Sequence, residues 1–204
     1  MKNIEIHVDV ACPFSYAGGE KMIQFLEKNN APLTNIRFRS FQLQPDDDNT
    51  KTNYLMNRFK TSGMNSVEEY KEFFARLIGD QIKSIGLDYN IETVISKNTI
   101  HAHMGLQYAT MFGKQAEYFR KVTRGHFAEG KDYYDFNYLD AVLTELGLDV
   151  KDFHSREEEM KNLVAEDMKL AAERGVRSVP TFYQNGIVLA GTGSVEEFEK
   201  FMLD

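Results

Sequence analysis

Alternating apolar and polar positions mark the two ends of the chain, and helical spacing fills the stretch between them. The alternation from Ile4 to Val10 predicts a strand. A helical pattern begins at Pro13, which suits the first helical position because no N–H is needed there. The Asn-Asn-Ala-Pro run at 29–32 ends this helix, and renewed alternation from Ile36 predicts a second strand.

The pattern is helical from Pro45 to about residue 155. Ser66 and Glu69 have capping-box spacing, which predicts a helix that the following apolar positions extend to Gly86. Three further helices are predicted over 98–112, 115–129 and 137–146, each followed by a glycine at a position suited to a C-cap, namely Gly113, Gly130 and Gly147.

Mixed structure returns in the last part of the chain. A second capping box, Ser155 to Glu158, predicts a helix that runs to Gly175. The Asn185-Gly186 pair between two apolar runs is the strongest short signal for a β-hairpin. A third capping box, Ser194 to Glu197, predicts a final helix.

These elements run β-α-β, then a helical block, then α-β-β-α. Without the block, this is the order of a thioredoxin fold. We therefore predict an α/β protein that has a thioredoxin-like fold with a large inserted helical domain. The thioredoxin-like domain is expected to be discontinuous, over 1–45 and 156–204, with the α-helical insertion over 46–155. A substrate groove is expected between the two.

Cys12 is the only cysteine of the chain, and it lies at the predicted strand-to-helix junction. Free backbone N–H groups and the helix dipole favour a thiolate there, so we predict a pKa below that of free cysteine. Ser15 occupies the place of the second cysteine in a CxxC motif, so no internal disulfide can form. The Ser15 hydroxyl can hydrogen-bond the thiolate, or it can only satisfy the first helical turn.

The overall charge narrows the class of partner. A formal charge of −7 and a pI near 5.3 argue against non-specific binding to nucleic acid or to anionic membranes. No apolar stretch has the length of a membrane span, and the strand-like N-terminus lacks the apolar core of a signal peptide. A single cysteine suits a reducing compartment, so we predict a cytoplasmic protein. The sequence leaves the oligomeric state unknown.

The sequence contains no convincing metal or nucleotide motif. His101 and His103 are two positions apart on a predicted helix, which makes them poor joint ligands. A zinc set would need further cysteines, and the chain has no glycine-rich phosphate fingerprint. We predict no metal and no tightly bound cofactor.

Three stretches of the chain resemble one family, in a consistent order. Residues 9–16, Asp-Val-Ala-Cys-Pro-Phe-Ser-Tyr, resemble the active-site strand and turn of DsbA-like thioredoxin-fold oxidoreductases. Residues 175–182 resemble their cis-proline segment. Asn98-Thr99, Ala102-His103 and the run at 127–132 resemble the inserted helical region of the cytoplasmic FrnE-type branch.

The resemblance implies thiol–disulfide exchange on a disulfide-containing protein or small molecule. Cys12 would be the nucleophile, with Ser15 beside it in the catalytic turn. The implied substrate-facing residues are Pro13, Phe14, Val179, Pro180 and His103. The resemblance also implies a cis bond between Val179 and Pro180, which leaves the Val179 backbone free to pair with an extended substrate. A packed helix histidine is the other interpretation of His103.

The motif of this chain, Cys-Pro-Phe-Ser, departs from the Cys-Pro-x-Cys of the family. A monothiol cycle would need an external thiol, such as glutathione or an equivalent, to resolve the intermediate. Two other functions stay open. One is a glutathione-dependent transferase or isomerase, of the kappa-class or hydroxychromene-carboxylate type, in which Cys12 or Ser15 orients the sulfur of the cosubstrate. The other is a non-catalytic binding module.

Overall fold

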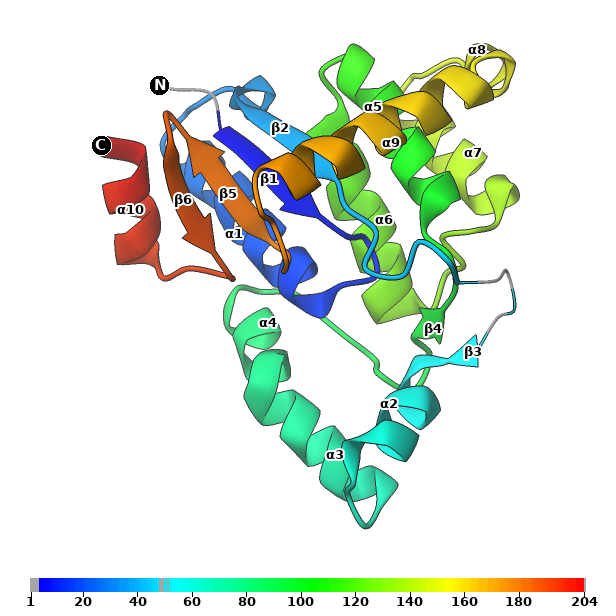
Figure 1. The fold of residues 1–204 in the computed structure, drawn as a ribbon, viewed down its shortest axis with the longest axis vertical. Coiled ribbons are helices and arrows are strands. Elements are labelled where there is room, and N and C mark those ends of the chain that lie inside the picture. Colours follow the sequence, from blue (N-terminus) through cyan, green and yellow to red (C-terminus); the bar gives the residue numbers. More distant parts are fainter. Residues whose placement is uncertain (1–3, 48–49, 51, 204) are drawn as a thin grey trace.

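The structure is a computed structural model that describes residues 4–47, 50 and 52–203. Its main sheet has the strand order β2-β1-β5-β6 (Figure 1). The strands are β1 (Ile4–Val8), β2 (Ile36–Ser40), β5 (Thr181–Gln184) and β6 (Ile187–Ala190). β1 pairs in parallel with β2 and antiparallel with β5, so the two halves of the chain meet at its centre.

Helices cover both faces of this sheet. α1 (Pro13–Lys28) lies on one face, and α9 (Glu157–Glu173) crosses the other in Figure 1. α10 (Val195–Leu203) ends the described chain beside β6. This arrangement is the predicted thioredoxin-like fold.

The helices α5 (Ile100–Met111), α6 (Gln115–Glu129), α7 (Phe136–Glu145) and α8 (Val150–Ser155) pack beside the sheet and share its core. Ile6 and Phe38 of the sheet belong to one buried cluster with Tyr118, Leu139 and Phe153 of these helices. The core therefore continues from the sheet into this part of the insertion.

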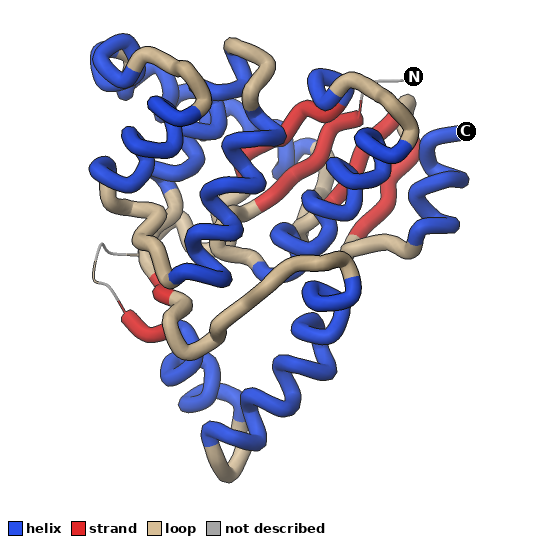
Figure 2. The backbone as a smooth tube through the Cα atoms, turned by 180° about the vertical axis from the view of Figure 1, so that it is seen from behind, coloured by secondary structure: helices blue, strands red, loops and turns tan. Residues whose placement is uncertain are grey.

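A second cluster belongs to what we call the helical arm, residues 54–84, which projects away from the sheet (Figures 1 and 2). The arm contains α2 (Tyr54–Ser62), α3 (Val67–Phe74), a π-helical turn over Ala75–Gly79 and α4 (Asp80–Ser84). Two short strands, β3 (Thr52–Asn53) and β4 (Ile95–Ser96), pair at its base. Its apolar cluster reaches Tyr16 of α1 and Phe127 of α6, which stack at 5.1 Å. The predicted domain boundaries, at 45/46 and 155/156, stay a prediction.

Most of the predicted local signals are confirmed. Asn185 and Gly186 have φ of 49° and 82°, as a two-residue hairpin turn requires. Ser66 accepts a hydrogen bond from the Glu69 N–H at 3.1 Å, and Ser194 accepts one from the Glu197 N–H at 3.1 Å. The pattern did not predict the helix α2, the short helix α8 or the β3–β4 pair.

The prediction that a capping box at Ser155 begins the next helix is wrong. α9 begins at Glu157 with Arg156 as its N-cap residue. Ser155 instead ends α8, where its hydroxyl donates to the Asp152 carbonyl at 2.8 Å. The same hydroxyl cannot cap the next helix, because it is directed back into the preceding turn.

Candidate active site

Cys12 is the N-cap residue of α1, directly after the turn that follows β1. Its N–H donates to the Asp9 carbonyl at 3.0 Å, and its own carbonyl accepts from the Tyr16 N–H at 3.0 Å. The residue is buried, with 5% exposure. Its thiol donates to the Val179 carbonyl at 3.5 Å, so the first helix and the proline segment meet at this sulfur.

The Val179–Pro180 peptide bond is cis, as expected from the sequence. The Pro180 carbonyl accepts from the Gly191 N–H at 2.9 Å, which fixes the segment against the end of β6. Pro180 also packs on Gly18 of α1: a Cβ at Gly18 would lie 2.7 Å from the proline Cγ. The glycine is therefore what allows the proline segment to reach the helix that carries Cys12.

The predicted low pKa of Cys12 is wrong. Burial raises the pKa of the thiol to about 11, and the nearby Asp9 charge adds to this increase. Hydrogen bonds from the backbone of Ser15 and Phe14 do lower the pKa, as the helix N-terminus argument requires. Desolvation outweighs them, so the resting thiol is protonated at neutral pH.

Ser15 serves both alternatives that the sequence left open. It is fully buried, and its hydroxyl accepts from the Asp9 N–H at 3.2 Å, which ties the turn to the helix. The same side chain also acts on Cys12 through a hydrogen bond that lowers the pKa of the thiol.

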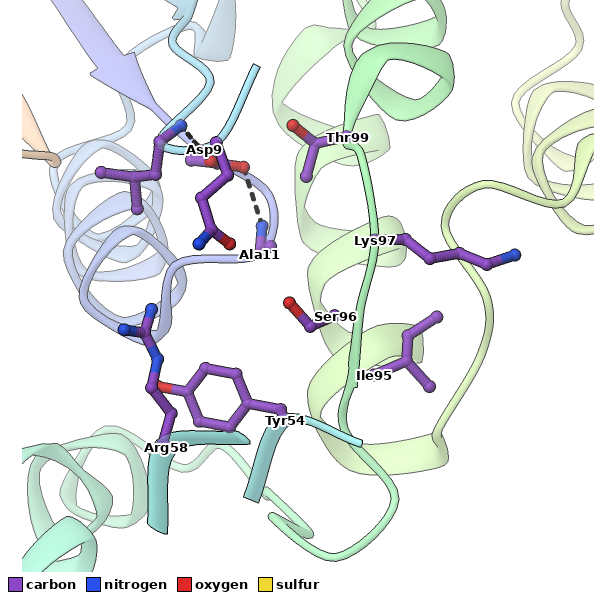
Figure 3. A pocket seen from close by; sticks show the side chains of 10 residues that line it. Asp9, Ala11, Tyr54, Arg58, Ile95, Ser96, Lys97 and Thr99 are labelled. Atoms are coloured by element: carbon purple, nitrogen blue, oxygen red, sulfur yellow. Dashed lines mark hydrogen bonds between the residues drawn. The ribbon is translucent and has the colours of Figure 1, made fainter. Parts of the chain in front are cut away.

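His103 does not line an accessible groove. It is fully buried on α5, and its Nε2 lies 3.6 Å from Asp9 Oδ1. The packed helix histidine is therefore the interpretation that fits, and the expected substrate-facing role is corrected. Asp9 itself holds the turn: its carboxylate accepts from the Ala11 N–H at 3.1 Å and from the Leu43 N–H at 2.8 Å (Figure 3). The sequence signal that could have identified Asp9 is a carboxylate at the end of an apolar strand, three residues before Cys12.

A groove of about 380 Å³ opens at Cys12; we call it the thiol groove. It is lined by Ala11, Cys12, Pro13, Phe14, Leu43, Tyr54, Arg58, Tyr70, Leu77, Arg177, Ser178 and Val179. Pro13, Phe14 and Val179 line this groove, whereas Pro180 is buried and is not among its lining residues. Their substrate-binding role stays a prediction. Arg58 and Arg177 are cationic, and none of the described lining residues is acidic.

Two neighbouring hollows share lining residues with the thiol groove: Tyr54 and Arg58 line all three. Figure 3 shows these two residues in the smaller hollow. One, of about 30 Å³, lies over Asp9. The other, of about 250 Å³, we call the polar extension, because Thr52, Asn57 and Ser96 are among its lining residues. Tyr54 and Arg58 had no distinguishing motif, since only the folded arm brings them to Cys12.

Within residues 4–47, 50 and 52–203, no three His, Cys, Asp or Glu side chains are grouped so as to hold a metal ion. None of the helices in the described part of the chain combines the length and apolar character needed to cross a bilayer.

Comparison with solved structures finds the same fold in other proteins. A probable DsbA oxidoreductase from Streptomyces coelicolor is 23% identical with a TM-score of 0.86, over 99% of this chain and 88% of that one. A 2-hydroxychromene-2-carboxylate isomerase is 17% identical with a TM-score of 0.72, over 98% and 93%. The cytosolic disulfide reductase DsbM from Pseudomonas aeruginosa, solved with GSH, is 15% identical with a TM-score of 0.66, over 98% and 97%. At these identities the likeness shows the fold.

A search of curated proteins found no match. The family model for the DSBA-like thioredoxin domain matches residues 3–202, which include both the turn at Cys12 and the segment at Pro180. With nearly the whole chain matched and these two segments in contact, the chain belongs to the family of DsbA-like thioredoxin domains.

Proposed function

We propose that this protein catalyses thiol–disulfide exchange with Cys12 as its single nucleophile. The observation that carries the proposal is the position of the Cys12 sulfur. It lies at the N-terminus of α1, 3.5 Å from the Val179 carbonyl of the cis-proline segment, and it borders the thiol groove. Membership of the DsbA-like family supports a thiol–disulfide oxidoreductase.

The cycle would run in two exchanges. The Cys12 thiol first gives up its proton to solvent, and the thiolate attacks one sulfur of a disulfide. The S–S bond of the substrate breaks, a mixed disulfide forms on Cys12, and the other sulfur leaves as a thiolate that takes up a proton. Ser15 cannot resolve the mixed disulfide, so an external thiolate attacks the substrate sulfur bound to Cys12. A new disulfide forms between these two sulfurs and departs, and Cys12 leaves as a thiolate that takes up a proton. A cytoplasmic location, where such thiols are abundant, is part of this proposal.

The charge of the thiol groove supports an anionic thiol cosubstrate, such as glutathione. Arg58 and Arg177 line the groove of a protein whose formal charge is −7. Both side chains are exposed, and no acidic residue stands among the described lining residues. Carboxylate groups of a small peptide thiol would therefore find guanidinium partners there. The solved DsbM neighbour with GSH is consistent with such a cosubstrate.

The test is to mix the reduced protein with glutathione disulfide and follow its intact mass and the release of glutathione. We expect one glutathione on Cys12, removed by added thiol, and none on a Cys12→Ser variant. Arg58→Gln and Arg177→Gln should each slow the reaction with glutathione disulfide about 3- to 10-fold. Arg177→Gln should not alter the reaction with the uncharged hydroxyethyl disulfide. A wild-type protein that forms no mixed disulfide would refute the exchange reaction.

A glutathione-dependent isomerase or transferase is the second candidate. The nearly complete burial of Cys12 and its raised pKa favour it, because such a reaction needs the site to orient the sulfur of the cosubstrate and not to attack with its own. This function would survive in Cys12→Ser, without net consumption of thiol. Binding of glutathione with neither reaction would point to the binding module instead.

A further inference from the structure

Tyr54 is one of the residues of the helical arm that line the thiol groove. It begins α2, and its N–H donates to the Val94 carbonyl at 3.1 Å. The N-cap residue Asn53 accepts from the Met56 N–H at 2.9 Å and donates to the Glu92 carbonyl at 3.1 Å. Both ends of the Asn53 side chain are thus used to fix the start of the helix.

The Tyr54 ring is also held from its two sides. Its edge packs on Phe74 at 6.4 Å between ring centroids, and the Arg58 guanidinium lies 5.3 Å from the ring centroid. Tyr70, another lining residue, lies near the hydroxyl. The phenol is therefore held in place before any substrate arrives.

Two properties suit this phenol to meet a negatively charged sulfur. Burial raises the pKa of Tyr54 well above its ordinary value, and the nearby Tyr70 and Cys12 raise it further, so the hydroxyl keeps its proton at any working pH. Arg58 brings a positive charge to the same wall of the groove. A neutral donor beside a cation stabilises an anion without giving its proton away.

The line of attack explains which sulfur Tyr54 would meet. A thiolate attacks a disulfide sulfur along the S–S bond, so the leaving sulfur lies on the side away from Cys12. The helical arm supplies the lining residues that do not come from the Cys12 turn or the proline segment, apart from Leu43. Figure 3 shows Tyr54 and Arg58 reaching from α2 toward the turn that carries Ala11.

We propose that Tyr54 donates a hydrogen bond to the sulfur that leaves when Cys12 attacks a disulfide, so that the arm supplies a catalytic residue. This inference rests on the exchange function proposed above. In the step, the Cys12–sulfur bond forms, the substrate S–S bond breaks, and its electron pair stays on the leaving sulfur. Tyr54 keeps its proton throughout, and the free thiolate is protonated by water after it departs.

The test compares Tyr54→Phe with Tyr89→Phe across a series of disulfides that share one half and differ in the acidity of the leaving thiol. Removing a hydrogen bond to a charged group should slow an aliphatic, weakly acidic leaving thiol about 10- to 100-fold. An acidic aromatic leaving thiol needs little stabilisation and should lose less than about 3-fold. Tyr89 packs on the same Phe74 ring but does not line the thiol groove, so Tyr89→Phe should leave the dependence on leaving-thiol acidity as in the wild type. The phenyl ring of Tyr54→Phe keeps the Phe74 and Arg58 contacts, so the fold is retained.

The outcomes separate this inference from the exchange function. Equal slowing across the series, or no slowing, in Tyr54→Phe with an active wild type overturns only the role of Tyr54. A wild-type protein that reacts with none of the disulfides overturns both. A steeper dependence on leaving-thiol acidity in Tyr54→Phe alone supports the proposal.

Discussion

Two opposing effects act on the pKa of the Cys12 thiol, and the exposure of Cys12 decides which of them prevails. The helix N-terminus supplies N–H groups that stabilise a thiolate, and the sequence alone reveals this effect. Burial removes water from the same sulfur, and only the folded structure reveals that exposure falls to 5%. Because a charge in a dry site is costly, desolvation prevails and the pKa of Cys12 rises to about 11.

The first prediction concerns the pH dependence of alkylation at Cys12. Below a pKa of about 11, the thiolate fraction grows tenfold with each pH unit, so the iodoacetamide rate should rise by about that factor per unit from pH 7 to 10 without a plateau. The urea-unfolded protein is the control, and its rate should level off above the free-cysteine pKa of about 8.5. A plateau near pH 7 in the native protein would contradict the burial argument.

The second prediction concerns His7, which is buried in β1 beside Arg174. Burial, followed by the Arg174 charge, lowers the pKa of His7 to about 4. In the unfolded chain His7 binds a proton near pH 6.5, whereas in the folded protein it does so only near pH 4. As the pH falls from 6.5 to 4, proton binding therefore stabilises the unfolded state relative to the folded state. Stability is therefore complete above pH 6.5 and declines by about 2–3 kcal/mol through that window.

Urea unfolding at pH 7, 5.5 and 4.5 measures this loss. His7→Gln should show a smaller decline than the wild type between pH 7 and 4.5. Some decline should remain in the variant, because burial also lowers the pKa of His126 to about 4. A variant whose stability falls as steeply as that of the wild type would rule out His7 as a source of acid sensitivity.

At the scale of elements, α1 joins the sheet, the proline segment and the insertion. Two successive glycines of α1 each allow one close contact. A Cβ at Gly18 would lie 2.7 Å from Pro180 Cγ, and a Cβ at Gly19 would lie 2.4 Å from the Phe119 ring of α6. The third prediction uses this pair. Gly18→Ala and Gly19→Ala should each lose about 1–2 kcal/mol of unfolding free energy, since overpacking exceeds the helical gain of alanine.

Only Gly18→Ala should change the rate at which Cys12 forms mixed disulfides, because only it displaces the segment that holds the Val179 carbonyl. The measurement is the reaction with hydroxyethyl disulfide, with Gly19→Ala as the matched control. Equal rates in the two variants would mean that the proline segment does not tune the thiol.

The elements that local chemistry determines were the ones the sequence could predict. Ser66 and Ser194 cap helices as expected because each hydroxyl has a free N–H three residues ahead. Ser155 satisfies the same spacing but ends α8, since that helix is stabilised by the Asp149 cap and by Phe153 in the core, which no short window reveals. Tyr54 and Arg58 enter the site only through long-range packing of the arm, so no local pattern identified them. Arg177 lies in the segment 175–182, which the family resemblance had singled out.

At the scale of the whole molecule, one buried carboxylate ties the sheet to two helices. Asp167 of α9 accepts hydrogen bonds from Arg39 Nη1 at 3.0 Å and from the Ser40 N–H at 2.8 Å, and also from Gln107 of α5. Its side chain is only 4% exposed. This cluster joins β2 to both helices, and the insertion is thereby fastened to the thioredoxin-like part.

The fourth prediction is that Asp167→Ala costs about 3–5 kcal/mol of unfolding free energy, because it leaves a partly buried guanidinium, a backbone N–H and an amide without their acceptor. Glu159→Ala, which removes an exposed ion pair to Arg156 on the same helix, should leave stability unchanged. Urea unfolding of the two variants measures this difference. Similar midpoints for Asp167→Ala and Glu159→Ala would contradict the role assigned to Asp167.

In the proposed cycle, the one cysteine thiol of the chain holds one substrate group at a time, and that group leaves only when a second thiol attacks it. The incoming thiol must reach the mixed disulfide at Cys12 while the bound substrate group still occupies the thiol groove. In a pocket with a single opening, the mixed disulfide would block the approach of the incoming thiol. The thiol groove is not isolated, because it shares Tyr54 and Arg58 with the polar extension. In the proposed cycle, the polar extension would give the bound group room beside these two residues, and the incoming thiol would approach Cys12 through the space that the group leaves.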